Sequence, residues 1–227
     1  MIAENLKSVG ERIENALLKA GRKAGSCRLV AVSKTFPASC VQEAYDAGQR
    51  LFGENRVQEL QGKVPELPGD IEWHLIGHLQ QNKVRHAVEN AAWIHSIDTL
   101  PLLKRVVGIA AELGRSPKLL LEVNVSGEES KFGMNPDDVI PVLTECASPL
   151  CCGLMTVAPF DATPDELHRI FARLRELKEQ ASAATGMALT ELSMGMSGDF
   201  EIAIAEGATL VRVGSAIFGH RDYGTGQ

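Results

Sequence analysis

The sequence has few of the features that mark membrane, disulfide-rich or nucleic-acid-binding proteins. No apolar run approaches the roughly 18 residues of a membrane span, and the first ten residues lack the apolar core of a secretion signal. The five cysteines are an odd number without a C-x-x-C pair, which predicts free thiols rather than disulfides or a zinc site. A net charge of −6 argues against nucleic-acid or anionic lipid partners. We therefore expect a cytoplasmic protein that contacts neither nucleic acid nor membrane.

The composition is instead that of an ordinary globular protein. Hydrophobic residues make up 44% and charged residues 23% of the 227 residues, which is enough apolar material for a sizeable core. No linker rich in proline, glycine and serine and no low-complexity tract divides the chain. We therefore expect residues 1–227 to form a single domain, with two small domains as the alternative.

A short β-branched run followed by a helical stretch recurs along the whole chain. An amphipathic helix comes first, and its apolar face carries Leu6, Val9, Ile13, Leu17 and Ala20. The runs that predict strands are residues 29–32, 50–52, 73–76, 93–97, 119–125, 152–157, 189–194 and 209–213. Helices are predicted to start near Pro37, Arg56, Gln81, Pro101, Pro136, Pro164 and Gly198. About eight such units in little more than 200 residues predict an α/β fold, a single (β/α)₈ TIM-type barrel, with a doubly wound open sheet as the alternative.

Polar residues and glycines follow almost every predicted strand. In a (β/α)₈ barrel the catalytic and binding groups come from the carboxyl ends of the strands and the loops after them. These positions hold Lys34, Glu54, Asn55, Gly77, His78, Asp98, Ser126, Thr156, residues 195–197, Gly214 and Ser215. We therefore expect a binding site at this end of the barrel.

Lys34 ends the first predicted strand, so its amine should project into the mouth of the barrel. Apolar walls there would depress the pKa of the amine, and a neutral amine can form a Schiff base. The alternative is a lysine whose stem lies along the strand end while its amine reaches water.

Residues 193–198 end the seventh predicted strand and open the next helix, and Gly214 and Ser215 follow the eighth strand. Exposed backbone amides, a hydroxyl and a helix N-terminus together can hold an anion, and such barrels often bind phosphate on these two loops. A single glycine turn capped by serine is common and has no functional meaning by itself. The pairing of two such turns at the expected strands favours a phosphate site.

Arg212 shares a strand face with Leu210 and Gly214, and if that face is interior the guanidinium needs an acceptor. Glu122 could supply one as a structural ion pair. Alternatively, Arg212 could donate to a ring nitrogen of a bound cofactor and hold that nitrogen unprotonated. The residues alone leave both open.

His74 and His78 have the spacing of a zinc-binding helix motif, but they lie in a predicted strand. Four residues of strand span about 13 Å, which is too far for two ligands of one metal. We therefore expect no metal site.

Seven ordered blocks of the sequence resemble the pyridoxal phosphate homeostasis proteins, the YggS/PROSC family. The blocks are AVSKT (31–35), FGEN (52–55), EWHLIGHLQ (72–80), GEESKFG (127–133), GLMT (153–156), LSMGMS (192–197) and VRVGSAIFG (211–219). They cover nearly the whole chain. The resemblance implies a barrel like the N-terminal domain of alanine racemase, the fold type III of pyridoxal 5′-phosphate (PLP) proteins, with PLP as the cofactor.

The resemblance also assigns roles to individual residues. Lys34 would be the Schiff-base lysine, and Arg212 would face the pyridine nitrogen. The phosphate would be held by Ser197, Gly214 and Ser215, and the pocket would be lined by Asn55 and Met155. If the cofactor also bound to a second lysine, Lys131 would be the first to test.

The function implied is a non-enzymatic carrier. It would hold PLP as a lysine Schiff base and buffer or deliver it within the cell through transient contact with PLP-dependent enzymes. The alternative is an amino-acid racemase, which needs a second acid/base; alanine racemases supply it as a tyrosine from a dimer-forming β domain. The tyrosines here are Tyr45 and Tyr223, and no such domain follows the last strand, so we expect a monomer without turnover.

Two further considerations bear on this expectation. An arginine at the ring nitrogen would weaken PLP as an electron sink, which lowers the case for carbanion chemistry. A third hypothesis, a Schiff-base aldolase acting on a phosphosugar, would use the same lysine and phosphate cradle without PLP.

Overall fold

The eight apolar runs form eight parallel strands that close into a barrel in chain order, with β8 paired to β1. The computed structural model describes residues 1–128 and 132–219. Its strands are β1 (Arg28–Val32), β2 (Leu51–Glu54), β3 (Glu72–Leu75), β4 (Trp93–Ile97), β5 (Lys118–Glu122), β6 (Cys151–Met155), β7 (Glu191–Ser193) and β8 (Leu210–Val213). The (β/α)₈ prediction is confirmed, and the open sheet is wrong.

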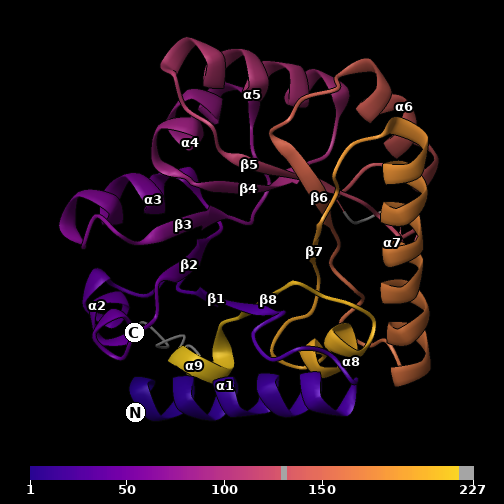
Figure 1. The fold of residues 1–227 in the computed structure, drawn as a ribbon. Coiled ribbons are helices and arrows are strands. Elements are labelled where there is room, and N and C mark those ends of the chain that lie inside the picture. Colours follow the sequence, from indigo (N-terminus) through magenta and orange to yellow (C-terminus); the bar gives the residue numbers. More distant parts are fainter. Residues whose placement is uncertain (129–131, 220–227) are drawn as a thin grey trace, which may run out of the picture.

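Helices surround the ring of strands, as Figure 1 shows. They are α1 (Ile2–Lys19), α2 (Ala38–Asp46), α3 (Val57–Lys63), α4 (Val84–Asn90), α5 (Leu100–Leu113), α6 (Val139–Glu145), α7 (Pro164–Thr185), α8 (Phe200–Ala205) and α9 (Ser215–Phe218). Short 3₁₀ turns precede or follow some of them, at η1 (Val64–Glu66), η2 (Gln81–Lys83) and η3 (Pro136–Asp138). No described helix is long and apolar enough to cross a membrane.

The predicted helix boundaries have clear local causes. Thr163 caps α7 by accepting from the backbone N–H of Glu166, whose side chain in turn accepts from the Thr163 backbone N–H. Pro164 occupies the first turn, where its missing N–H costs nothing. Gly114 ends α5 with φ of 59°, a left-handed conformation that glycine adopts without a steric penalty.

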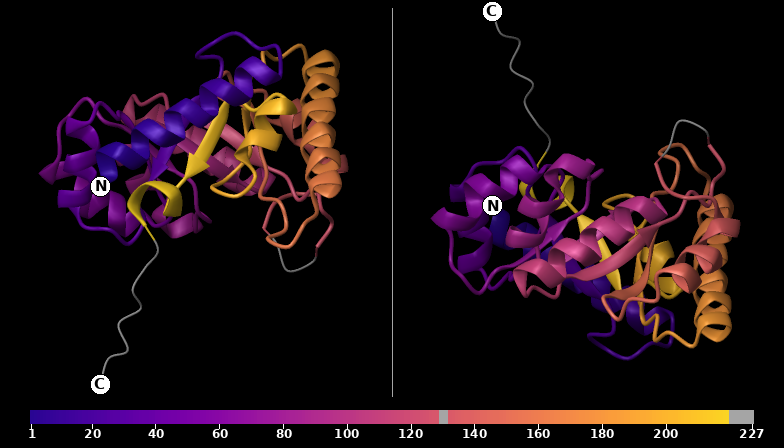
Figure 2. Two further views of the ribbon diagram at one scale, coloured as in Figure 1. Left: turned by 90° about the horizontal axis from the view of Figure 1, so that it is seen from below. Right: turned by 90° about the horizontal axis from the view of Figure 1, so that it is seen from above.

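The first helix completes the outer layer where the last two helices are short. α8 has six residues and α9 has four, and α1 packs along both and against α2. Arg12 forms an ion pair of 2.8 Å with Glu201 of α8, and Asn5 Nδ2 donates to the Ile217 carbonyl of α9 at 2.9 Å. Figure 2 shows α1 running across this side of the barrel.

The strands bury both of their faces. An inner cluster fills the barrel with Val30, Trp93, Leu120, Met155 and Leu210, and a larger cluster lies between strands and helices. β6 and β7 approach so closely that a Cβ on Gly153 would lie 2.0 Å from the carbonyl oxygen of Glu191. All five cysteines are free thiols, as the sequence predicts.

Four predicted strands are longer than the observed β5, β6, β7 and β8. β5 ends at Glu122, after which Val123 makes a single bridge to Met134. β6 ends at Met155, although the predicted run continues to residue 157. Val123 and Val125 are buried although they lie beyond β5, whereas Val157 beyond β6 is 37% exposed.

Candidate functional site

A cavity of about 560 Å³ lies at the carboxyl end of the barrel. Lys34 reaches it from the end of β1, beside Phe36 from the following loop and Ile76 from the end of β3. The opposite wall comes from the loops after β7 and β8. The residues there are Met196, Ser197, Gly198, Asp199, Gly214 and Ser215.

Strained backbone follows Lys34 directly. Thr35 has φ of 67°, and among the described residues it is the one non-glycine with positive φ. A β-branched residue adopts this conformation at a cost, so the surroundings must hold it there. Its N–H donates to Glu59 Oε2 at 3.1 Å, which ties the segment to α3. The strain therefore fixes how the chain, and with it Lys34, leaves the strand.

The loops after β7 and β8 are joined by Ser197. Its hydroxyl accepts from the Gly214 backbone N–H at a long 3.4 Å. The turn after β7 is tight at Gly195, where φ is 96° and a Cβ would lie 2.6 Å from the Cβ of Ala203. A Cβ on Gly214 would lie 3.2 Å from the Val32 carbonyl oxygen, so the end of β8 packs closely on β1.

These loops offer individual donors rather than a strong helix dipole. The helices that follow them have only six and four residues. The sequence prediction included a helix N-terminus in the anion site, but helices this short add little. The hydroxyls of Ser197 and Ser215 and the backbone amides beside them are the groups that can bind an anion.

Arg212 forms the inner wall of the cavity and is 3% exposed. Its Nη1 donates to Ser193 Oγ at 2.6 Å and its Nη2 to the Thr156 carbonyl at 2.9 Å. Neither bond goes to Glu122, which the sequence had offered as an ion-pair partner. Burial lowers the pKa of Arg212 to about 10, although the negative charges of Glu122 and Asp199 raise it. The guanidinium therefore stays cationic at neutral pH.

The other predicted site residues lie around the cavity rather than in its wall. Asn55 lines a neighbouring hollow of about 620 Å³ with Glu59 and His78. Met155 is fully buried in the inner cluster of the barrel. Lys131 and Tyr223 lie outside the described residues.

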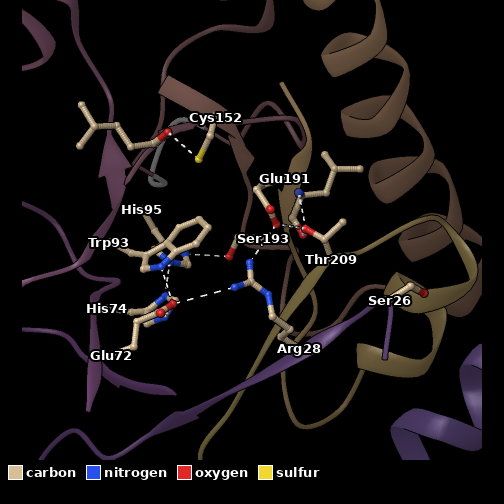
Figure 3. Close-up of polar contacts among 12 residues, drawn as sticks. Ser26, Arg28, Glu72, His74, Trp93, His95, Cys152, Glu191, Ser193 and Thr209 are labelled. Atoms are coloured by element: carbon tan, nitrogen blue, oxygen red, sulfur yellow. Dashed lines mark hydrogen bonds and ion pairs between the residues drawn. The ribbon is translucent and has the colours of Figure 1, made fainter. Parts of the chain in front are cut away.

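Two buried histidines inside the barrel, His74 and His95, were not predicted as part of a site. His95 Nδ1 lies 2.8 Å from Ser193 Oγ, and His95 Nε2 lies 2.8 Å from His74 Nδ1, as Figure 3 shows. Burial lowers the pKa of both histidines, so both are neutral at pH 7. Each interrupts an apolar strand, which is the signal that singled out Arg212.

The arrangement places an amine, a buried guanidinium and a pair of hydroxyl- and amide-bearing loops around one cavity. Such a set suits a small ligand with an anionic group at one end and an electrophile at the other. No second base of the tyrosine type joins it within the described residues. Tyr45 instead donates to Asp70 Oδ1 at 2.7 Å on the outside of the barrel.

Comparison with known proteins gives consistent matches along the chain. Residues 9–222 match the family model "Alanine racemase, N-terminal domain". The chain is 46% identical over 229 residues to the pyridoxal phosphate homeostasis protein of Pseudomonas aeruginosa, covering 98% of this chain and 97% of that one. It is 41% identical over 224 residues to the protein of the same name from Aquifex aeolicus, covering 97% and 98%.

A solved structure matches equally well. PipY of Synechococcus elongatus, determined with PLP bound, is 44% identical and superposes with a TM-score of 0.84. The match covers 96% of this chain and 100% of PipY.

Proposed function

Because this chain belongs to the family of pyridoxal phosphate homeostasis proteins, we propose that it binds PLP in the cavity at the carboxyl end of its barrel. Its role is to buffer and deliver the cofactor within the cell, without catalytic turnover of its own. Residues 1–227 act as one PLP-binding domain. The observation that carries the proposal is the convergence of Lys34, Arg212 and the Ser197 loop on one cavity.

The cavity residues fit the chemistry of PLP group by group. When bound, PLP supplies an aldehyde that condenses with a primary amine, and it carries a phosphate and a pyridine nitrogen. Lys34 is the amine, held by the constrained turn at Thr35. The phosphate is bound by Ser197, Gly214 and Ser215. Because Gly214 has no side chain, the end of β8 that carries it packs closely on β1.

Arg212 favours a carrier over an enzyme that stabilises a carbanion on PLP. Its guanidinium is cationic at neutral pH and cannot accept a proton, so a ring nitrogen facing it stays unprotonated. An unprotonated ring is a weaker electron sink. Asn55 and Met155 support the site indirectly: Asn55 lines the adjacent hollow, and Met155 packs inside the barrel.

The racemase alternative would need a second acid/base facing Lys34. Within residues 1–128 and 132–219 no tyrosine lines the cavity. The aldolase alternative shares Lys34 and the phosphate loops but predicts no bound chromophore. We further propose a cytoplasmic monomer that meets PLP-dependent enzymes transiently; light scattering on a sizing column tests the monomer.

The decisive experiment is an absorbance titration of the purified protein with PLP, followed by borohydride reduction and peptide mass mapping. We expect one main adduct, on Lys34. Lys34→Ala should abolish it while the circular dichroism stays that of the wild type. Lys104→Ala, which removes an exposed lysine paired with Glu145 on the outside of the barrel, is the matched control.

Either result is informative. Adduct spread over surface lysines, or an unchanged adduct in Lys34→Ala, would contradict the proposed site. Residual specific adduct would direct the search to Lys131. Amino-acid turnover by the loaded protein at rates of an ordinary racemase would overturn the carrier role and leave the PLP site standing.

A further inference from the structure

A line of polar side chains crosses the inside of the barrel from the cavity to the opposite end. It continues from Arg212 through Ser193 and His95 to His74, in steps of 2.6, 2.8 and 2.8 Å. His74 Nε2 then lies 3.4 Å from Glu72 Oε1, a long contact that is electrostatic rather than an ideal hydrogen bond. Figure 3 shows Ser193, His95, His74 and Glu72 in this succession. We call these four residues and Arg212 the interior chain.

The two ends of the interior chain fix the direction of its hydrogen bonds. Arg212 has only donors, so Ser193 Oγ must accept from it. Glu72 is a carboxylate whose pKa is lowered to about 2, chiefly by His74, so it only accepts. It also accepts from Trp93 Nε1 at 2.6 Å, and Arg28 lies 3.9 Å away.

One set of tautomers gives each contact between these ends one donor and one acceptor, with His74 Nε2–H left at a long 3.4 Å from Glu72 Oε1. Ser193 donates its hydroxyl hydrogen to His95 Nδ1, His95 Nε2–H donates to His74 Nδ1, and His74 Nε2–H faces Glu72. In the reverse direction Ser193 Oγ would accept from both Arg212 and His95, and its own hydroxyl hydrogen would have no acceptor in the interior chain. The reverse direction would also set the lone pair of His74 Nε2 against the Glu72 carboxylate. Both histidines are fully buried, so water does not relieve such a conflict.

We propose that Ser193, His95 and His74 are positioning residues for PLP, acting through Arg212. The hydroxyl of Ser193 is held with its lone pair toward Arg212 Nη1, while the Thr156 carbonyl binds Nη2. Two bonds fix the plane of the guanidinium, and its remaining N–H groups are left for the cavity that it lines. This inference rests on the PLP site proposed above.

The position of these residues argues against mere filling of the barrel. Barrel interiors of this type are packed mainly with branched apolar side chains, as Val30, Leu120 and Leu210 do here. Buried polar groups in such a place carry a desolvation cost unless each is satisfied. The interior chain has matched donors and acceptors in one direction only, and it ends on the guanidinium that lines the cavity. This is the reason why we assign it a positioning role.

The first test needs no cofactor. Long-range ¹H–¹⁵N NMR of the ligand-free protein at pH 7.5 reports the tautomer of each histidine. We expect both His74 and His95 as the Nε2–H form. Either residue as the Nδ1–H form, or as an averaged mixture of the two, would overturn the direction of the interior chain.

The second test uses His95→Leu, His95→Gln and Ser96→Ala, each titrated with PLP. His95→Leu interrupts the hydrogen bonds of the interior chain. We expect the Kd for PLP to rise about tenfold, which is about 1.4 kcal/mol, and the absorption maximum of bound PLP to shift. The amide of the introduced glutamine can accept from Ser193 and donate to His74, so His95→Gln should recover part of both. Ser96 is the matched control, because it is buried on the same strand and its hydroxyl makes no hydrogen bond to the interior chain.

The outcomes separate the inference from the proposed function. A folded His95→Leu with the wild-type Kd and spectrum, or an equal loss in Ser96→Ala, would overturn the positioning role while PLP binding stands. If His95→Leu does not fold, Ser193→Ala supplies the same comparison. A wild-type protein that binds no PLP at Lys34 would instead refute the proposed function, and the NMR result would still report on the chain.

Discussion

Replacing Gly153 with alanine should open the barrel between β6 and β7. A Cβ at this position would lie 2.0 Å from the carbonyl oxygen, 2.7 Å from the carbonyl carbon and 2.9 Å from the Cα of Glu191. All three are backbone atoms of the neighbouring strand, which pairs Gly153 with Glu191. They cannot rotate away as a side chain would, so the two strands must separate.

The expected cost is at the upper end of the range for overpacking, about 3 kcal/mol. For a chain of this length that corresponds to a fall in Tm of roughly 6–12 °C. The same change at Gly10 is the matched control, because its Cβ would meet nothing within 4 Å. Alanine there, in the middle of α1, should stabilise the protein by about 0.5–1 kcal/mol through its better helix propensity.

Differential scanning calorimetry of the two variants and the wild type measures both effects. Gly153→Ala should also weaken PLP binding, because Ser193 and Thr156 follow on these strands and both hold Arg212. If Gly153→Ala melts within about 2 °C of the wild type, the argument from the strand approach is refuted, since no relaxation compatible with the ladder would be so cheap.

Two further changes test the electrostatics of the site. Burial raises the pKa of Glu122 from 4.5 to about 7, so the folded state holds this proton more tightly than the unfolded state and wild-type stability falls as pH rises through that interval. Glu122→Gln should therefore gain Tm relative to the wild type between pH 5 and pH 8; a constant difference across this range would contradict the shift. Ser197→Ala should raise the Kd for PLP roughly tenfold to a hundredfold, the loss of one hydrogen bond to a charged group, whereas Ser96→Ala should leave it unchanged. Equal affinities of Ser197→Ala and the wild type would remove Ser197 from the phosphate site.

The repeated pattern of the chain predicts most of the fold. Most strands appear as short apolar runs, and proline at the first turn or glycine at the end marks most helices. Lys34, Ser197 and Ser215 could be placed at one end of the barrel because parallel strands all end there. Their meeting in one cavity follows from closure of the barrel, which the number of units already implied.

The inside of the barrel was less predictable. His95 on β4 meets Ser193 on β7 across the interior, and nothing in the sequence near either residue encodes that contact. β4 and β7 are not neighbours, so the contact depends on the registers of all the strand pairs between them, including the irregular register between β4 and β5. Asn55 shows the opposite case: it follows a strand as expected, but Gly77 packs against its backbone and it lines the next hollow.

The placement of α1 sets an order of events during synthesis. Its apolar face is covered by α8 and α9, and one of its contacts, from Asn5 to Ile217, joins residues 212 positions apart. At ribosomal rates of about 5–20 residues per second, that partner emerges roughly 10–40 s after the helix does. The face of α1 that packs against α8 and α9 therefore stays uncovered while β2 to β7 are made, and of its three helical partners only α2 emerges early. A chaperone that binds exposed apolar surface during synthesis should therefore bind at α1.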